Sequence, residues 1–147
     1  MKVCTFFGHR DCPETVKPKL KAVLEELVVC HGVDTFYVGH QGRFDAMAHR
    51  TLQELKSRYP HIRVTVVLAY MPTDNTTDYV DTVFPEGLEI TPPRYAIVRR
   101  NNWMLRQSDC VVAYITHAFG GAYRCVEQAV RQRKIVISLA AESPCNL

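Results

Sequence analysis

A glycine pair late in the chain has the residue types and the spacing of a phosphate-binding loop. Gly120 and Gly121 follow an apolar run over 110–115 and come directly before a segment with helical periodicity. Bare glycine backbone lets an anion approach closely, and the N-terminus of a helix offers N–H groups and the positive end of a dipole. Glu127 follows within that helix and could face the same pocket. The pattern predicts a site for a phosphate group, without deciding between binding and catalysis.

Polar segments follow three of the apolar runs that predict strands. Because the carboxyl ends of parallel strands meet at one edge of a sheet, the rim, these segments are expected to converge there. Their convergence carries more weight than any single motif, since a lone glycine is common in strand-to-helix loops. The residues expected to contact a ligand at the rim are Gly8, His9, Arg10, Gly39, Gly42, Asp45, Thr116, His117, Gly120 and Gly121.

Charged residues at the rim each have a functional and a structural interpretation. Arg10 could hold a phosphate or carboxylate with two parallel hydrogen bonds, or could form an ion pair with Asp11 or Asp45. Asp45 could accept a bond from a ribose hydroxyl, or could complement the dipole of the helix that it begins. Arg100 and Asn101 could turn toward the rim and contact a ligand, or could belong to a solvated basic face of their helix.

Histidines occupy equivalent positions on three of the loops, at His9, His40 and His117. Three histidines could together form a metal site. Loop histidines more often make hydrogen bonds or contact a polar ligand, and we favour that interpretation here. We therefore expect neither a metal ion nor a bound cofactor.

The elements that must position these residues alternate between strand and helix. Strands are expected at 3–7, 35–38, 63–70, 109–115 and 135–139, and helices at 14–29, 44–59, 94–107 and 121–133. Such alternation predicts a parallel sheet with helices on both faces. Right-handed crossovers favour the strand order 3-2-1-4-5. The expected fold is a three-layer, doubly wound, Rossmann-like α/β fold with a mostly parallel five-stranded sheet.

The length of 147 residues suits a single domain over the whole chain. The range 71–93 interrupts the alternation with four prolines and is expected to form a long loop or lid. The last residues, 140–147, are expected to form a tail. An apolar face near Trp103 could support a homo-oligomer, by analogy with other Rossmann-like proteins.

Charge and composition narrow the classes of partner. The formal net charge of +3 is mild, and the chain has no long basic run and no aromatic-basic platform, so nucleic acid is not an expected partner. No apolar stretch is long enough to span a membrane. The six cysteines lie far apart without a C-x-x-C pair, which favours a reducing cytoplasm.

Four motifs follow one another along the chain: Phe7-Gly8-His9-Arg10-Asp11, Gly39-x-x-Gly42-x-Phe44-Asp45, Arg100-Asn101-x-Trp103-Met104, and Ser108-Asp109 leading into Gly120-Gly121. Taken together, they resemble the YpsA-like branch of the SLOG superfamily, whose members are related to the Lonely-guy phosphoribohydrolases and to the DNA-processing protein DprA. The resemblance covers nearly the whole chain and is specific as a set. It implies a rim that binds a nucleotide or a nucleotide-derived ligand, in a sensor or regulatory module.

The enzymes related to this branch imply an alternative function, hydrolysis of an N-glycosidic bond of a nucleotide. Their loop P-G-G-x-G-T-x-x-E ends in a glutamate that would correspond to Glu127, and Arg10 or Arg100 would be the arginine that holds the phosphate. A carboxylate beneath the sugar stabilises the oxocarbenium-like transition state. The structural interpretation of Glu127 is a surface pair with Arg131.

Three positions depart from the pattern of the enzymes. Phe119 replaces the proline, Tyr123 the third glycine and Arg124 the threonine. The tyrosine would crowd backbone that should lie close to a phosphate, and the threonine hydroxyl is lost. These departures weigh against catalysis more than against binding.

Overall fold

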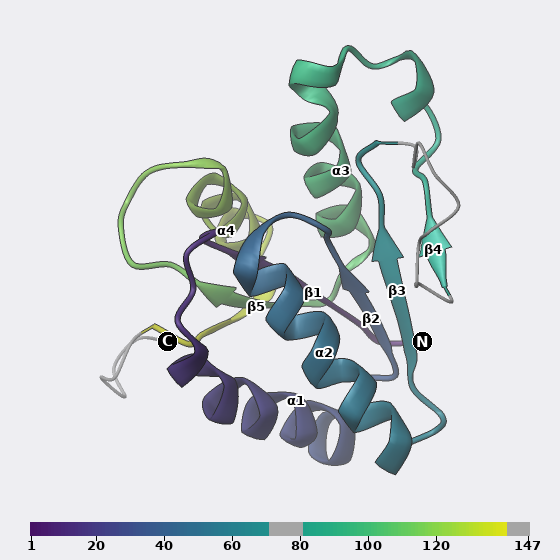
Figure 1. Ribbon diagram of the computed structural model, residues 1–147, viewed down its shortest axis with the longest axis vertical. Coiled ribbons are helices and arrows are strands. Elements are labelled where there is room, and N and C mark those ends of the chain that lie inside the picture. Colours follow the sequence, from purple (N-terminus) through teal and green to yellow (C-terminus); the bar gives the residue numbers. More distant parts are fainter. Residues whose placement is uncertain (71–80, 141–147) are drawn as a thin grey trace.

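The computed structural model describes residues 1–70 and 81–140, and the fold is a parallel six-stranded sheet with helices on both faces (Figure 1). The strand order is β4-β3-β2-β1-β5-β6, and every pairing is parallel. The strands are β1 (Val3–Gly8), β2 (Thr35–Val38), β3 (Arg63–Val67), β4 (Thr82–Val83), β5 (Cys110–Tyr114) and β6 (Ile135–Ser138). The helices are α1 (Lys17–His31), α2 (Gly42–Arg58), α3 (Pro93–Gln107) and α4 (Gly121–Arg131).

The central strand β1 pairs with β2 on one side and with β5 on the other. The order of strands along the chain reverses between β1 and β5, which makes this the switch point of a doubly wound sheet. The three-layer Rossmann-like α/β fold is therefore confirmed, and so is the expected contact between the first strand and the strand that precedes the glycine pair.

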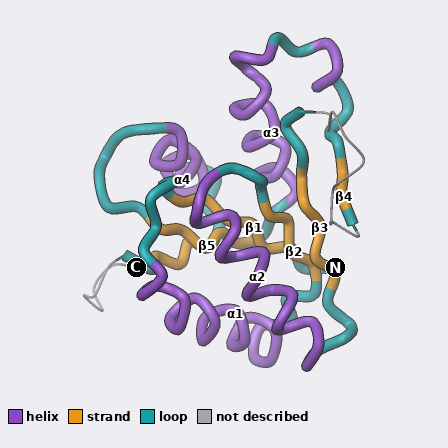
Figure 2. Tube along the Cα trace, in the orientation of Figure 1, coloured by secondary structure: helices purple, strands orange, loops and turns teal. Residues whose placement is uncertain are grey.

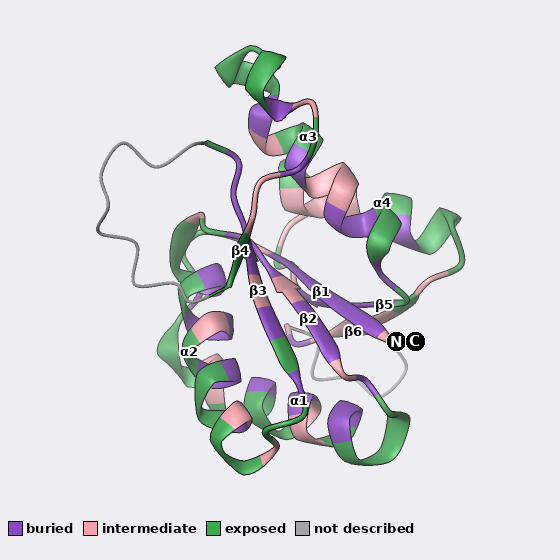
Figure 3. Cartoon of the chain, turned by 90° about the vertical axis from the view of Figure 1, so that its right-hand side faces the viewer, coloured by how far each residue is buried: buried purple, intermediate pink, exposed green. Residues whose placement is uncertain are grey.

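Adjacent side chains of β1 point to opposite faces of the sheet and so enter different cores. Phe6 packs in the core under α1 and α2, where it contacts Phe36 and Phe44 at ring-centroid distances of 6.2 and 6.4 Å. Phe7 packs with Met104 and other residues in the core under α3 and α4. Figure 2 shows the strands between these helix pairs. Figure 3 shows β1 and β2 buried along most of their length, whereas the residues of the edge strands β4 and β6 are exposed or partly buried.

The expectation of five strands is wrong by one, because β4 forms an additional edge strand within the range expected as a loop. Thr82 pairs with Val66 and Val83 with Val67. A two-residue strand has no periodicity to reveal it, and only the exposed edge of β3 selects it. A short 3-10 turn at Leu88–Ile90 follows. Residues 71–80, the first part of the expected lid, and 141–147, nearly all of the expected tail, lie outside the described residues.

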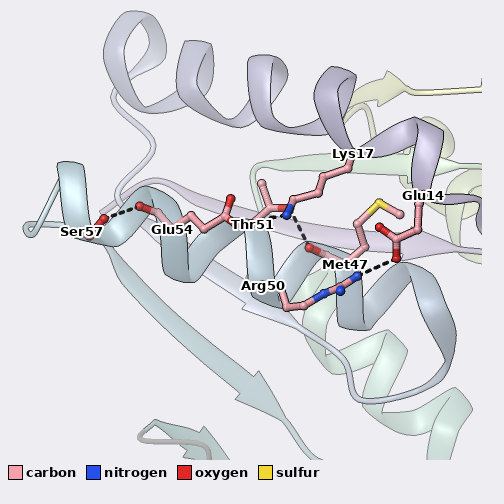
Figure 4. Close-up of polar contacts among 7 residues, drawn as sticks. All are labelled: Glu14, Lys17, Met47, Arg50, Thr51, Glu54 and Ser57. Atoms are coloured by element: carbon pink, nitrogen blue, oxygen red, sulfur yellow. Dashed lines mark hydrogen bonds and ion pairs between the residues drawn. The ribbon is translucent and has the colours of Figure 1, made fainter.

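Ion pairs join the start of α1, and the 3-10 turn Glu14–Val16 before it, to the middle and C-terminal half of α2 (Figure 4). Lys17 Nζ lies 3.1 Å from Glu54 Oε1, and Arg50 Nη2 lies 2.9 Å from Glu14 Oε1. Exposed pairs contribute about 0–1 kcal/mol each, so the buried leucines beneath set the position of the two helices. In the described ranges, no helix is long and apolar enough to cross a membrane.

Gly8 ends β1 in direct contact with the first turns of α2. A Cβ at this position would lie 2.3 Å from Phe44 Cδ2, far closer than two carbon atoms can approach. The absence of a side chain therefore lets Phe44 fill the core beneath the rim. Packing against Phe44 therefore explains why position 8 is a glycine, and no ligand is needed to explain it.

Replacing Gly8 with alanine should lower the free energy of unfolding by about 1–3 kcal/mol, because the added methyl group overpacks a filled core. Gly121 is the matched control, since a Cβ there would meet no other atom within 4 Å. Urea unfolding followed by circular dichroism measures both variants. Equal midpoints for Gly8→Ala and the unsubstituted protein would show that Phe44 shifts without cost.

Candidate functional site

A cavity of about 230 Å³ opens at the rim, between the ends of β1 and β2 and the helices α2, α3 and α4. The structure brings together in it residues from four of the segments singled out in the sequence. Its described lining consists of Phe6, Phe7, Gly8, His9, Arg10, Gln41, Asp45, Ile97, Arg100, Asn101, Met104, Gly121 and Ala122.

A second cavity, of about 330 Å³, lies beside the first and shares Asp45 with it. Gly39 and Gly42, both expected at the rim, line this second cavity together with His40 and residues of α2. Asp45 therefore stands between the two cavities. The expected rim residues that line a cavity form two neighbouring groups around one carboxylate, whereas Thr116, His117 and Gly120 are in the described lining of neither cavity.

Gly39 lies where the Asp45 carboxylate and the Arg100 guanidinium both approach the end of β2. A Cβ on this glycine would lie 2.7 Å from Asp45 Oδ2 and 3.0 Å from Arg100 Nη1. The two charged side chains are 8% and 2% exposed. A buried carboxylate and a buried guanidinium thus occupy the space that any other residue's side chain would take.

Hydrogen bonds hold both buried charges. Asp45 Oδ2 accepts the backbone N–H of Gln41 at 2.8 Å. Arg100 Nε donates to Asn101 Oδ1 at 3.0 Å, and its Nη1 donates to the carbonyl of Val67 at 3.4 Å. Arg100 therefore braces α3 against the end of β3, which places Asn101 on the wall of the first cavity.

Burial controls the protonation of the two groups. Burial raises the pKa of Asp45 from 3.8 to about 6, while the Gln41 N–H, Arg100 and Arg10 act in the opposite direction. Burial also lowers the pKa of Arg100, and Asp45 is first among the groups that oppose this shift. The carboxyl thus changes its charge close to neutral pH.

Arg10 is exposed, and its backbone is fixed against the start of α2. Its carbonyl accepts the N–H of Arg43 at 2.9 Å, and a Cβ on Gly42 would lie 2.9 Å from its Cα. Gly42 has a φ of 89°, which favours glycine. The ion pairs of the described residues do not include one between Arg10 and Asp11 or Asp45.

His9 is 8% exposed, and its Nε2 atom has no hydrogen-bond partner within the described ranges. Its backbone N–H donates to the carbonyl of Tyr114 at 3.2 Å, which ties the first loop to the end of β5. Burial lowers the pKa of His9, and the nearby His117 adds to this effect while Asp11 opposes it. A buried polar atom without a partner is uncommon and marks a position where a ligand atom would be favoured.

The three histidines do not converge on one point. His9 and His117 stack face to face with centroids 3.7 Å apart, whereas His40 lines the second cavity. Within the described ranges, no group of three histidine, cysteine or acidic side chains is placed to hold a metal ion.

The glycine pair begins α4, as the sequence predicts. Gly120 has a φ of 97°, and a Cβ on either glycine would meet no other atom within 4 Å. Packing therefore does not explain the absence of side chains here, in contrast to Gly8 and Gly39. Gly121 lines the first cavity at the N-terminal end of the helix.

Glu127 and Thr116 line neither rim cavity among the described residues. The inner face of α4 carries Ala122, Cys125 and Ala129, which pack in the core under α3 and α4. Glu127 lies well around the helix from that face, at about 100° of rotation per residue. Its catalytic role stays a prediction from the resemblance.

Sequence reasoning missed several residues that line the first cavity. Ile97 and Met104 stand three residues before Arg100 and three residues after Asn101, a spacing that puts all of them on one helix face. That periodicity could have predicted which residues of α3 line the first cavity. Gln41 carries no such signal, because its described hydrogen bond to Asp45 uses backbone N–H.

Comparison with known proteins finds similarity of fold only. No protein-family model matches the chain, and no curated protein matches it. DNA processing protein A (DprA) from Streptococcus pneumoniae superposes with a TM-score of 0.70 at 16% identity, over 94% of this chain and 50% of that one. DNA processing protein A from Helicobacter pylori superposes with a TM-score of 0.65 at 13% identity, over 93% of this chain and 64% of that protein. The chain thus spans about half to two thirds of the length of these proteins.

The kinship with DprA that the resemblance implied is supported at the level of fold, while membership of the YpsA-like branch stays a prediction. The expectation against nucleic acid is wrong on this comparison, since the H. pylori protein has a single-stranded DNA binding mode and shares this fold. That expectation relied on the mild net charge and on the absence of a long basic run and of an aromatic-basic platform in the sequence. A single-strand groove is assembled from basic and aromatic residues that only the folded surface brings together, so criteria applied along the sequence do not detect it.

The raised pKa of Asp45 should make stability depend on pH between about 4 and about 6. In this range the folded protein keeps the proton on the carboxyl while the unfolded chain releases it, so stability falls as the pH rises. Above the range the penalty is on the order of 3 kcal/mol. Asp45→Asn should flatten the slope, because the amide cannot ionise yet still offers an oxygen to the Gln41 N–H.

Urea unfolding of both proteins at several pH values from about 4 to about 7 measures this difference. Burial lowers the pKa of His9 and of His49, so these groups contribute a slope of opposite sign. They titrate in both proteins, and the difference between the two curves therefore reports Asp45. If the stabilities of the two proteins change in parallel with pH, the prediction that burial opposes the ionisation of Asp45 is wrong.

Proposed function

We propose that the rim cavity binds a nucleotide or a nucleotide-derived ligand through its phosphate, and that the protein acts as a sensor or regulatory module. The observation that carries this proposal is the convergence on one cavity of Arg10, the N-terminus of α4 and His9, whose Nε2 is buried without a described hydrogen-bond partner. A guanidinium, an imidazole N–H and helix N–H groups are all donors suited to phosphate oxygens.

The two cavities suggest how the ligand divides between them. Small-molecule sites usually measure about 300–1,000 Å³, and the first cavity is smaller than that at about 230 Å³. It suits a phosphate and part of a sugar, with the remainder of the ligand outside it. Asp45, between the cavities, is placed to accept a hydrogen bond from a sugar hydroxyl in its ionised form.

Cleavage of an N-glycosidic bond remains the alternative that the resemblance implies. Asp45 is the one carboxylate in the described lining of the two rim cavities, and Glu127 is absent from both. No described contact favours Glu127 as the group beneath a bound sugar. Binding is therefore the function that the geometry supports best.

Replacing Arg10 with alanine should weaken the binding of adenosine monophosphate about 10- to 100-fold. The reason is that a charge-assisted hydrogen bond contributes about 1.5–3 kcal/mol. Arg10→Lys should recover part of the affinity, since lysine keeps the charge without the fork geometry. Isothermal titration calorimetry measures the Kd of each protein.

Arg131→Ala is the matched control, because it removes the same charge from an exposed position that lines neither rim cavity. Its Kd should equal that of the unsubstituted protein. An equal loss of affinity in Arg10→Ala and Arg131→Ala would show that only the net charge of the protein matters for binding. If no nucleotide, dinucleotide or ADP-ribose derivative binds at millimolar concentration, the proposal is wrong.

Single-stranded nucleic acid is a second candidate ligand, favoured by an observation away from the rim. A groove of about 460 Å³ runs along the outer face of α3, lined in part by Tyr95, Arg99, Asn102 and Arg106. Tyr95 is 53% exposed. The helix contains no acidic residue. An exposed aromatic ring beside two arginines is the residue combination that binds stacked bases and phosphates, and Glu86 is the one acidic residue in the described lining of the groove.

The double variant Arg99→Ala, Arg106→Ala should weaken binding of an oligothymidylate and reduce the slope of log affinity against log salt by about 2. Fluorescence anisotropy at several salt concentrations measures both quantities. Arg10→Ala is the informative comparison. If this variant binds the oligonucleotide more weakly, the nucleic acid lies at the rim and not along α3. An unchanged affinity and slope in the double variant would remove the outer face of α3 from consideration.

A further inference from the structure

Three aromatic rings form a stack that leads from the first cavity to the protein surface. The ring of His9 lies 3.7 Å from that of His117, with an angle of 10° between the planes. The ring of His117 lies 4.0 Å from that of Phe119, at 33°. Exposure increases along the stack, from 8% at His9 to 69% at Phe119.

We propose that the outer face of Phe119 is a stacking surface for an aromatic base, so that the ligand is a nucleotide with its base intact and not a sugar phosphate alone. This inference rests on the proposed function, which places the phosphate at the adjacent cavity. Bases stack on aromatic side chains whatever their sequence, because each base offers a flat π-face. Phe119 departs from the proline of the related enzymes, and the change supplies such a surface.

The order of the stack supports an outward-facing surface. His117 covers one side of the phenyl ring, and the hydroxyl of Thr116 lies 3.3 Å from His117 Nδ1, which helps to fix the orientation of the imidazole. Much of the remaining phenyl surface lies exposed. An aromatic ring oriented by stacking on one side loses little conformational freedom when a base stacks on the other.

The surroundings of Phe119 provide the space that a ribose and base need. The next two residues are Gly120 and Gly121, where an added Cβ would meet no other atom within 4 Å. Gly121 also lines the first cavity. Two residues of extended chain span roughly 7 Å, a separation that a ribose can bridge between a phosphate at Gly121 and a base on Phe119.

The unpartnered atom of His9 connects the stack with the phosphate site. His9 lines the first cavity, and its Nε2 is buried without a described partner. A phosphate oxygen in the cavity would supply that partner. The stack thus joins the cavity proposed to hold the phosphate, at its inner end, to the exposed phenyl ring at its outer end.

The test compares adenosine monophosphate with ribose 5-phosphate, which lacks the base. Phe119→Ala should weaken the binding of adenosine monophosphate about tenfold or more and leave that of ribose 5-phosphate unchanged. Phe119→Trp should retain the affinity, and its added indole fluorescence should be quenched by adenosine monophosphate. Ile135→Ala is the matched control, since Ile135 is an apolar side chain that is 58% exposed and lines neither rim cavity.

The outcomes separate this inference from the proposal that it extends. If both ligands bind the unsubstituted protein and Phe119→Ala leaves their affinity ratio unchanged, the stacking surface is wrong while the phosphate site stands. Loss of an oligomer in Phe119→Ala with an unchanged ratio would assign the ring to a subunit contact and overturn the inference. If neither ligand binds the unsubstituted protein, the proposed function fails and this inference with it.

Discussion

The parallel pairing of β1 with β5 is the interaction on which the rest of the structure depends. It joins segments that are more than a hundred residues apart in sequence, with Cys4 opposite Cys110 and Gly8 opposite Tyr114. The pairing continues into the loops, because the His9 N–H donates to the Tyr114 carbonyl. The loop after β1 and the loop before α4 therefore leave the sheet side by side. A slip in this register would separate His9 from His117.

Two buried charged side chains, Asp45 and Arg100, connect the helices beneath the rim, as the strand pairing connects the loops above it. Asp45 and Arg100 approach the end of β2 from α2 and α3, the helices on opposite faces of the sheet. Gly39 leaves room for both, so charged groups from the two helix layers lie close together at the rim, where we propose that a ligand binds. Because burial opposes the charge on each group, this centre is electrostatically sensitive to any anion placed beside it.

The sequence predicted the layers because periodicity reports which faces are buried, and it predicted the order of five strands because crossovers between parallel strands are right-handed. It also predicted the convergence of strand ends, since parallel strands share one rim. It did not predict β4, whose two residues are selected by the edge of β3. It interpreted Glu127 as a candidate for the pocket from its spacing to the glycine pair, yet spacing along a helix does not say which side faces the cavity.

By itself, the sequence determined the alternation of strand and helix, the glycines at turns and helix starts, and the polar character of the rim. These properties follow from local patterns, in which each residue's role depends on near neighbours. Only the tertiary structure decided that Gly8 is required by Phe44, that Asp45 is buried beside Arg100, and that His9 stacks on His117. Those contacts join distant segments, and their distances depend on how strands pair and helices pack across the whole sheet.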